Sequence, residues 1–333
     1  MSSARSRRAW ILLLLLPVSA LAAILIGRYG PDLVSALRAL LSLGEFDENL
    51  RTLILRVRLP RMLAAACIGA NLAVSGTVFQ SLFRNPLVDS RILGVSSGAA
   101  FGAALALLLS LGTLGLQSMA FAFALVAVGL VLLVGRQFGS APLILVVGGI
   151  LISALFQALL GLLKYVADPL SKLPAITYWL LGGLTSVRWA TVGPLLGISL
   201  IGLLFFLAIR WRLDALTLPE NEAAALGVRV RELRALALGI GTLLIAASVA
   251  VGGIIGWIGL VVPHLARAWI GPEHSRSIPV ALGVGALSVI LLDTVARTVL
   301  PSEIPLGILT GLLGVPAFFV LFIRFMHTRG EPR

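Results

Sequence analysis

The stretch RLPRMLAAACIGANLAVSGTVFQSLFRNPLVDSRILGVSSGAAFG, residues 58–102, decides the fold class. Its apolar segment 62–82 is long enough to cross the hydrocarbon core of a bilayer, which takes about 20 residues. The polar turn RNPLVDS (84–90) follows, with Asn85 before Pro86, and a second apolar segment rich in Gly, Ala and Ser comes next. The pattern predicts two membrane-crossing helices joined by a turn that proline enforces.

The composition indicates that the rest of the chain has the same character. Of 333 residues, 59% are hydrophobic and 12% are charged, whereas about 25% of the residues of a soluble domain are charged. The apolar runs lack the polar faces of helices that border water. The net charge of +12 falls in short gaps between these runs, where orientation signals belong, which disfavours a nucleic-acid-binding protein. We therefore expect an all-α polytopic membrane protein.

Ten segments are expected to span the membrane, and together they make residues 1–333 a single transmembrane domain. Segment 257–270 is short for a full crossing, and the apolar stretch 175–187 is expected to form an extra re-entrant or interfacial helix. The first segment follows a basic start, as in a signal peptide, but its length favours a helix that stays attached. The ten are 9–27, 62–82, 92–111, 116–135, 143–163, 190–209, 236–255, 257–270, 278–296 and 305–323.

The basic residues favour an orientation with both termini in the cytoplasm. With that topology, 16 of the 26 Lys and Arg residues lie inside and 10 outside, as the positive-inside rule expects. The outer loop 28–61 holds six arginines all the same. That departure from the rule suggests that some of them have a function.

The longest polar cytoplasmic segment is RWRLDALTLPENEAAALGVRVRELR (210–234). Pro219 is typical of a helix start, and Glu220 and Glu222 are favourable in a first turn. Gly227 suits a helix end. These signals predict a short surface helix near 219–228 that a cytoplasmic partner could grip.

The chain lacks the sequence features of an ATPase. A phosphate-binding loop needs a Gly-rich turn that ends in Lys followed by Ser or Thr. The chain has two lysines: Lys164 precedes Tyr165, and Lys172 precedes Leu173. Neither lysine fits the motif, so this chain is not expected to hydrolyse ATP.

An ion-coupled carrier and a metalloprotein are also disfavoured. A carrier buries ionisable groups at membrane depth, and only Asp293 lies clearly within a span. Arg297 follows it on the same helix face, which favours an intrahelical ion pair over a proton relay. The three histidines do not cluster as metal ligands, and the lone Cys67 fits a small buried hydrophobe. Energy must then come from a partner.

Four stretches, in order, resemble the FecCD family of ABC importer permeases, which serve uptake of iron siderophores, heme and vitamin B12. They are residues 58–102, quoted above, YWLLGGL (178–184), GWIGLVVPHLAR (256–267) and DTVARTVLPSEIPLGILTGLLGVPAFFVLF (293–322). The resemblance implies the type II ABC importer permease fold, with ten transmembrane helices, in the bacterial inner membrane. It implies a homodimer with a translocation path along its interface and a periplasmic substrate-binding protein. It also implies two cytoplasmic ATPase subunits that bind ATP and Mg, with no cofactor and no catalytic residue in this chain.

The resemblance also assigns roles to outer arginines. Residues matching Arg58, Arg61 and Arg297 face acidic residues of the binding protein in the family, and the arginine fork suits such carboxylate pairing. From the residues alone, anchoring at the headgroups or pairing with local acids fits equally well. The local acids in question are Glu45, Asp47 and Glu48.

On the cytoplasmic side the resemblance implies a coupling helix and a gate. The coupling helix, which sits in a groove of the ATPase, matches Glu220, Glu222, Ala223, Leu226 and Gly227. Family members usually carry Gly where this chain has Pro219, which leaves the shape of this helix open. The gate candidates are Asn85, Leu87, Ser140 and Ala141.

The function expected from the sequence is import of an iron chelate by alternating access, driven by ATP hydrolysis in the partner. Heme ranks first, ferric siderophores second and cobalamin third, on overall likeness to heme-type members. One alternative is a secondary active transporter that uses Asp293 and Arg297. A membrane-embedded enzyme would need a catalytic cluster at one depth, and the sequence offers none.

Overall fold

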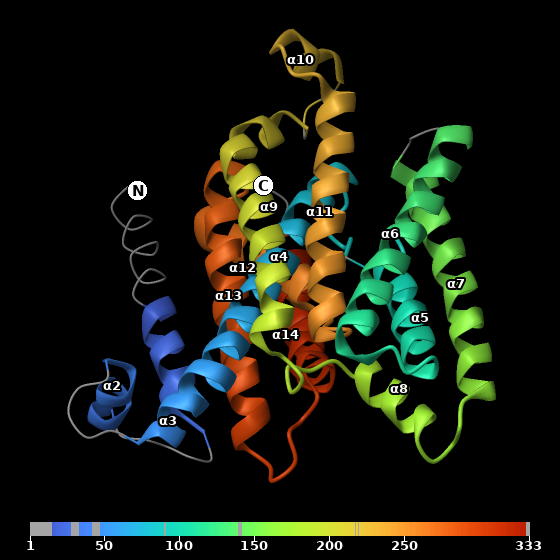
Figure 1. Cartoon of the computed structure of the whole chain (residues 1–333). Helices are drawn as coiled ribbons and strands as arrows, with labels where there is room; N and C mark the ends of the chain where they lie inside the picture. The colour runs from blue at the N-terminus through green and yellow to red at the C-terminus, as the bar shows by residue number, and fades with distance from the viewer. Residues whose placement is uncertain are drawn as a thin grey trace.

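The computed structural model describes residues 15–27, 33–41, 47–89, 91–138, 142–216, 218 and 220–330. Every regular element in these ranges is a helix, so the prediction of an all-α protein is confirmed for this part of the chain (Figure 1). In chain order the helices are Leu15–Leu25, α2 (Leu33–Leu41), α3 (Glu48–Thr52), the π-helix η1 (Leu53–Arg58), α4 (Leu59–Leu82), α5 (Val95–Leu108), α6 (Gly112–Phe138), α7 (Pro142–Val166), α8 (Lys172–Leu180), α9 (Trp189–Ala215), α10 (Glu220–Ala225), α11 (Val230–Gly252), α12 (Ile258–Ile270), α13 (His274–Thr298) and α14 (Leu306–Gly330).

The helices coincide with the expected spans, but not all of them are long enough to count as crossings. Six helices in the described ranges can cross a membrane by length and composition: Glu48–Leu82, which α3, η1 and α4 form together, and α6, α7, α9, α11 and α13. The helix Leu15–Leu25, α5, α12 and the apolar part of α14 are shorter. Ten crossings therefore remain a prediction. The stretch 175–187 holds the end of α8 and the non-helical residues that follow it.

Helix α4 lies in the middle of the bundle and packs against α9, α11, α12 and α13 (Figure 1). Glycine makes this approach possible. A Cβ on Gly69 would lie 2.0 Å from the carbonyl oxygen of Gly285 in α13, and one on Gly76 would lie 2.0 Å from that of Gly259 at the start of α12. Close backbone contact of this kind holds helices together in lipid, where burial of apolar surface gives no drive for association.

Helices α5, α6 and α7 pack together as a second group, in which α5 and α6 contact α11 of the first group. A Cβ on Gly98 or Gly102 of α5 would lie 2.3 Å from a carbonyl oxygen of α6, that of Phe123 or Met119. The dense run of small residues at 94–104 therefore serves helix packing, as its composition predicts.

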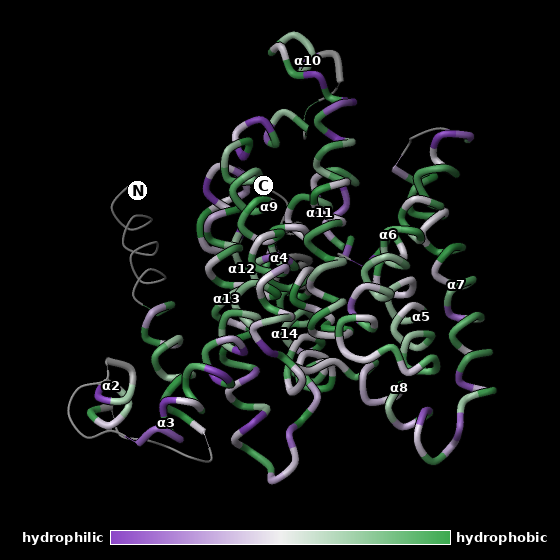
Figure 2. The backbone as a smooth tube through the Cα atoms, in the orientation of Figure 1, coloured by the Kyte–Doolittle hydropathy of each residue, from purple (hydrophilic) through white to green (hydrophobic). Residues whose placement is uncertain are grey.

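The bundle has two polar ends and an apolar middle. Hydrophobic residues dominate the middle of the long helices, and hydrophilic residues gather toward their ends (Figure 2). Helix α10 lies at one end, and α2, α3 and α8 lie at the other (Figure 1). We name these the α10 end and the α8 end; in the predicted topology they are cytoplasmic and outer, respectively.

Candidate functional site

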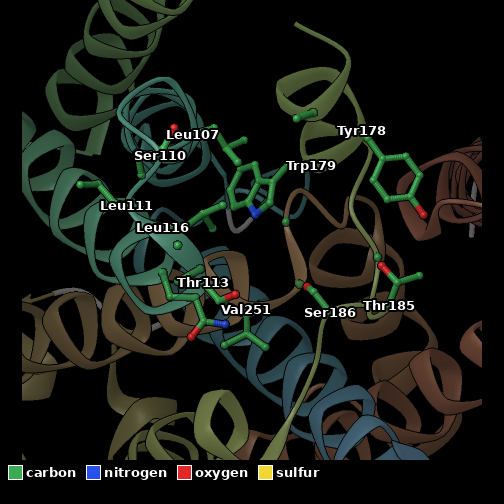
Figure 3. A pocket seen from close by; sticks show the side chains of 18 of the residues that line it. Leu107, Ser110, Leu111, Thr113, Leu116, Tyr178, Trp179, Thr185, Ser186 and Val251 are labelled. Carbon is green, nitrogen blue, oxygen red and sulfur yellow. The ribbon is translucent and has the colours of Figure 1, made fainter. Parts of the chain in front are cut away.

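A cavity of about 620 Å³ opens at the α8 end, between the turn that joins α5 to α6, helix α8 and the end of α11 (Figure 3). Figure 3 shows Ser110, Leu111 and Leu116 on one side of this outer cavity and Tyr178 and Thr185 on the other. Among the described residues, its wall combines apolar, aromatic and hydroxyl side chains with a single charged residue, Lys172, and no carboxylate. The lining residues are Ala106, Leu107, Ser110, Leu111, Gly112, Thr113, Leu116, Gln117, Ser171, Lys172, Ala175, Tyr178, Trp179, Gly183, Thr185, Ser186, Ala250, Val251, Gly252 and Gly253.

Lys172 is fixed where α8 meets the end of α5. Its ammonium donates to the carbonyl oxygen of Leu107 at 3.0 Å and to the hydroxyl of Ser110. A cation at a helix C-terminus is favourable because the last carbonyls have no partner in the helix. Asp168, in the loop before α8, accepts from the backbone N–H of Leu170 at 2.7 Å and of Ser171 at 3.3 Å. These hydrogen bonds lower the pKa of Asp168, the one to Leu170 most of all.

Two stretches of irregular backbone meet the start of α14 at the floor of the outer cavity: the residues after α8 and those between α11 and α12. The N–H of Gly183 donates to Gly252 at 2.8 Å, and the N–H of Leu306 donates to Gly182 at 2.9 Å. Gly253 has φ +67°, and a Cβ there would lie 2.6 Å from the carbonyl oxygen of Trp179. We call this the glycine junction. Non-helical backbone at membrane depth is tolerated where it is buried or lines a cavity, and both conditions hold here.

A second cavity of about 370 Å³, the inner cavity, lies nearer the α10 end of α5. Ser96 and Ser97 from the first turn of α5 line it, whereas the last turn of the same helix lines the outer cavity. Ile254 of the glycine junction also lines it, next in sequence to Gly253 of the outer cavity. The two cavities thus lie along one helix, with the glycine junction beside both.

The predicted gate residues have different positions. Leu87 lines the inner cavity and is 54% exposed. Asn85 does not line it; its side-chain oxygen accepts from the N–H of Leu87 at 2.9 Å and so shapes the turn. Ser140 and Ala141 lie outside the described residues. The sequence interpretation overlooked Arg91, whose Nε donates to Asp89 at 2.6 Å in the wall of the inner cavity.

The three arginines predicted for docking converge at the α8 end, where the chain itself buries them. Arg61 is 8% exposed and holds two carboxylates. Its Nε and Nη2 donate to Asp293 at 2.8–3.0 Å, and its Nη1 and Nη2 donate to Glu303 at 3.0 and 2.8 Å. Arg297, one turn along α13, lies 3.9 Å from Asp293. The intrahelical ion pair expected from the sequence is therefore present, but the closer partner of Asp293 is Arg61.

Arg58 and Arg297 also bind the end of the first helix. Arg58 donates to the carbonyl oxygens of Ile24 and Leu25, and Arg297 donates to that of Ala23. These are carbonyls that helix geometry leaves without a partner in the helix. The arginines thus tie the helix Leu15–Leu25 to η1 and α13.

The acids suggested from the neighbouring sequence differ from the partners that the structure shows for Arg61. Asp47 caps α3 by accepting from the N–H of Asn49 at 2.8 Å, and Glu45 lies outside the described residues. The cavity beside Asp293 has a volume of about 10 Å³, room for about one water molecule. Asp293 is held in ion pairs and does not line the outer or the inner cavity.

Helix α10 occupies the segment predicted to couple to a partner. Ala223 is fully buried, Glu222 is exposed and Leu226 is 67% exposed. Glu220 begins the helix, and Gly227 follows its end with φ +76°. Arg84, in the turn after α4, donates to the carbonyl oxygen of Leu218 at 2.6 Å. This hydrogen bond connects the turn that carries Asn85 and Leu87 to the segment that leads into α10.

Comparison with known proteins supports the resemblance. The profile of the FecCD transport family matches residues 13–324. The molybdate import system permease protein MolB of Haemophilus influenzae is 41% identical over 93% of this chain and 93% of its own length. The hemin transport system permease protein HmuU of Yersinia pestis is 40% identical over 83% of this chain and 84% of its own length. A solved structure, described as an inward-facing conformation of a metal-chelate type ABC transporter, superposes with a TM-score of 0.87 at 39% identity, covering 96% of this chain and 99% of that one.

Proposed function

Because this chain belongs to the FecCD transport family of ABC importer permeases, we propose that two copies of it form the membrane path for an anionic metal complex. The observation that carries this proposal is the outer cavity. It is wide and largely apolar, and in the part of the chain that the structure describes no carboxylate lines it and Lys172 is its single charged lining residue. An apolar pocket with few polar groups suits a ligand that must be held weakly and released.

Heme is the first candidate for the cargo, ferric siderophores the second and cobalamin the third. Molybdate joins them, since the relatives named for molybdate and for hemin are about equally similar to this chain. Heme, through its propionates, and molybdate are anionic at neutral pH, whereas the charge of a ferric siderophore depends on its chelating groups. Lys172 would attract an anionic cargo into the outer cavity, and the absence of lining carboxylates removes a source of repulsion.

The work would come from two cytoplasmic ATPase subunits that bind ATP and Mg. We propose that α10 is the element they grip, through Glu220, Glu222, Ala223, Leu226 and Gly227. The hydrogen bond from Arg84 to Leu218 supports a route by which movement of α10 reaches the turn at Asn85 and Leu87. That turn, with Ser140 and Ala141, would then open or close the inner cavity.

A periplasmic binding protein would deliver the cargo to the α8 end, with Arg58, Arg61 and Arg297 as docking residues. Because the chain itself buries these arginines, they must become accessible before they can contact a partner. The carbonyl contacts of Arg58 must loosen before its guanidinium can meet a carboxylate of the partner. A test compares the affinity of the binding protein for reconstituted Arg58→Gln with that for Arg188→Gln, an exposed arginine at the same end. Equal affinities would remove Arg58 from the docking surface.

The ion pairs of Asp293 favour an importer driven by a partner over a secondary transporter. A proton relay needs a carboxyl group that can gain and lose its proton along the path. Asp293 is held by Arg61, lines a cavity of about 10 Å³, and does not line the outer or the inner cavity. The deciding experiment measures uptake of heme, a ferric siderophore, cobalamin and molybdate into vesicles with the reconstituted complex. Uptake that depends on ATP supports the proposal. Uptake that a proton gradient drives in the absence of ATP would refute it.

A further inference from the structure

A cluster of arginines lines a cavity of about 510 Å³ at the α10 end, which shares no lining residue with the outer or the inner cavity. Arg136 comes from the last turn of α6, and Arg231 and Arg234 come from the first turns of α11. The remaining lining residues are Leu132, Gly135, Leu145, Ala235 and Leu238. None of the described residues that line this cavity carries a carboxylate. The nearest acid in sequence, Glu232, forms an ion pair with Arg229 at 3.3 Å.

The walls of this basic cavity belong to three membrane-length helices. Leu132, Leu145 and Leu238 lie on α6, α7 and α11, each of which can span a bilayer. Arg136 lies near the end of α6, and Arg231 and Arg234 lie near the start of α11. Leu132 and Leu238 lie one turn farther into the same two helices, and Leu145 lies in the first turn of α7. In the predicted topology the arginines are therefore at headgroup level, and the leucines are where the acyl chains begin.

We propose that this cavity binds the headgroup of an anionic phospholipid from the adjacent leaflet. Arginine forks pair with phosphate oxygens through two parallel hydrogen bonds. Basic pockets between transmembrane helices fit anionic headgroups, and juxtamembrane cations attract anionic lipids. The acyl chains of such a lipid would lie along the three leucines. A zwitterionic lipid offers the same phosphate but brings its own cation into a cavity that already holds three.

A soluble partner is a less suitable occupant. The apolar wall lies on α6, α7 and α11, which are long and apolar enough to span a bilayer, and α10 extends beyond the adjoining ends of α6 and α7 (Figure 1). A cytoplasmic protein that grips α10 would meet that helix first. A larger cavity of about 800 Å³ at the same end contains Arg212 together with Asp214 and Glu273. Its mixed charge makes Arg212 a matched control.

The test uses the purified full-length chain in bilayer discs of phosphatidylcholine, with and without phosphatidylglycerol. Native mass spectrometry after extraction reports the lipids that stay bound, and thermal unfolding reports the stabilisation. The proposal expects wild type to retain phosphatidylglycerol in preference to phosphatidylcholine and to unfold at a higher temperature with it. Each of Arg136→Gln, Arg231→Gln and Arg234→Gln should lower that preference by about fivefold. Arg212→Gln should leave it unchanged.

Three results would overturn the proposal. One is equal retention of both lipids by wild type. Another is an equal rise in the unfolding temperature when inorganic phosphate is added to protein in phosphatidylcholine discs and when phosphatidylglycerol is present in the discs. The third is a triple arginine variant that keeps its lipid preference but loses affinity for the ATPase subunits, which would assign the cluster to that partner. Arg136 and Arg231 are exposed, so their single variants, checked by circular dichroism, keep the test valid if the triple variant does not fold.

Discussion

Arg61 on α4 and Asp293 on α13 are 232 positions apart in sequence and form a buried ion pair, with Arg61 Nη2 2.8 Å from Asp293 Oδ1. Removing Asp293 leaves Arg61 with Glu303 as its remaining carboxylate and takes away the carboxylate that Arg297 faces at 3.9 Å, so two arginines at this buried site are less well neutralised. Asp293→Asn should therefore lower the free energy of unfolding by about 3 kcal/mol. Denaturant unfolding of the purified chain in detergent measures this. Glu232→Gln, in an exposed pair with Arg229, should cost less than about 1 kcal/mol; equal costs would show that the buried pair is not a structural anchor.

Lys172 at the mouth of the outer cavity should matter for uptake and little for folding. Lys172→Gln keeps a donor for Leu107 but removes the charge, so uptake of an anionic cargo should fall several-fold, while Lys172→Arg should retain most of it. Lys164→Gln, at the chain's other lysine near the end of α7, should transport like wild type. Vesicle uptake at low and high salt measures the effect. Uptake that does not respond to the charge at position 172 would contradict an anionic cargo attracted by Lys172.

Gly253 in the glycine junction should not accept a side chain. Its backbone, with φ +67° and ψ −159°, lies in a region that L-residues avoid, and a Cβ would meet the carbonyl oxygen of Trp179. Gly253→Ala should therefore cost roughly 1–3 kcal/mol from the backbone alone. Gly197→Ala in α9, where nothing lies within 4 Å, should stabilise the helix by about 0.5–1 kcal/mol. Unfolding temperatures of the two variants should shift in opposite directions.

Leu226 beyond α10 should matter only when the ATPase subunits are present. It is 67% exposed, so Leu226→Asp should leave the isolated chain stable and reduce the ATPase activity that the permease stimulates. The control is Leu170→Asp at the α8 end, 92% exposed, which should leave stimulation unchanged. If Leu170→Asp reduced the stimulation and Leu226→Asp did not, the α8 end would face the cytoplasm, opposite to the predicted orientation.

Arg84 should connect α10 to the turn that carries Leu87. Arg84→Gln weakens the hydrogen bond to Leu218, so ATP hydrolysis should continue while less cargo is carried for each ATP consumed. The ratio of uptake to hydrolysis in vesicles measures this coupling. Arg212→Gln at the same end should keep the ratio of wild type. An unchanged ratio in Arg84→Gln would exclude this hydrogen bond from the route.

Much of the fold followed from local patterns. Apolar runs of membrane length located the helices, because a segment in lipid must satisfy its own backbone hydrogen bonds and only a helix does so within one segment. The small residues at 94–104 indicated close packing for the same local reason. Pro219 and Gly227 bounded the segment in which α10 lies, since they act within one helical turn.

The sites were harder to predict because their residues come from distant segments. Asp293 looked like a partner of Arg297, since the two are four residues apart on one helix, and nothing local pointed to Arg61 or Glu303. The sequence interpretation considered Lys172 only as a candidate for the lysine of an ATPase motif, which it does not fit. Its place in the outer cavity depends on the end of α5, more than 60 positions earlier (Leu107). One sequence feature could have pointed to a surface role for Lys172, since it lies in the short gap between two apolar segments.

The sequence by itself determined that this chain is a helical membrane protein of the FecCD family with no ATPase motif of its own. Those properties depend on hydropathy and on motifs that a linear chain displays. Only the tertiary structure decided that Arg58, Arg61 and Arg297 are held by the chain's own carboxylates and carbonyls, and that α5 runs between two cavities. Side chains that are far apart in sequence meet only when helices pack, and small differences in helix rotation decide which charges become neighbours.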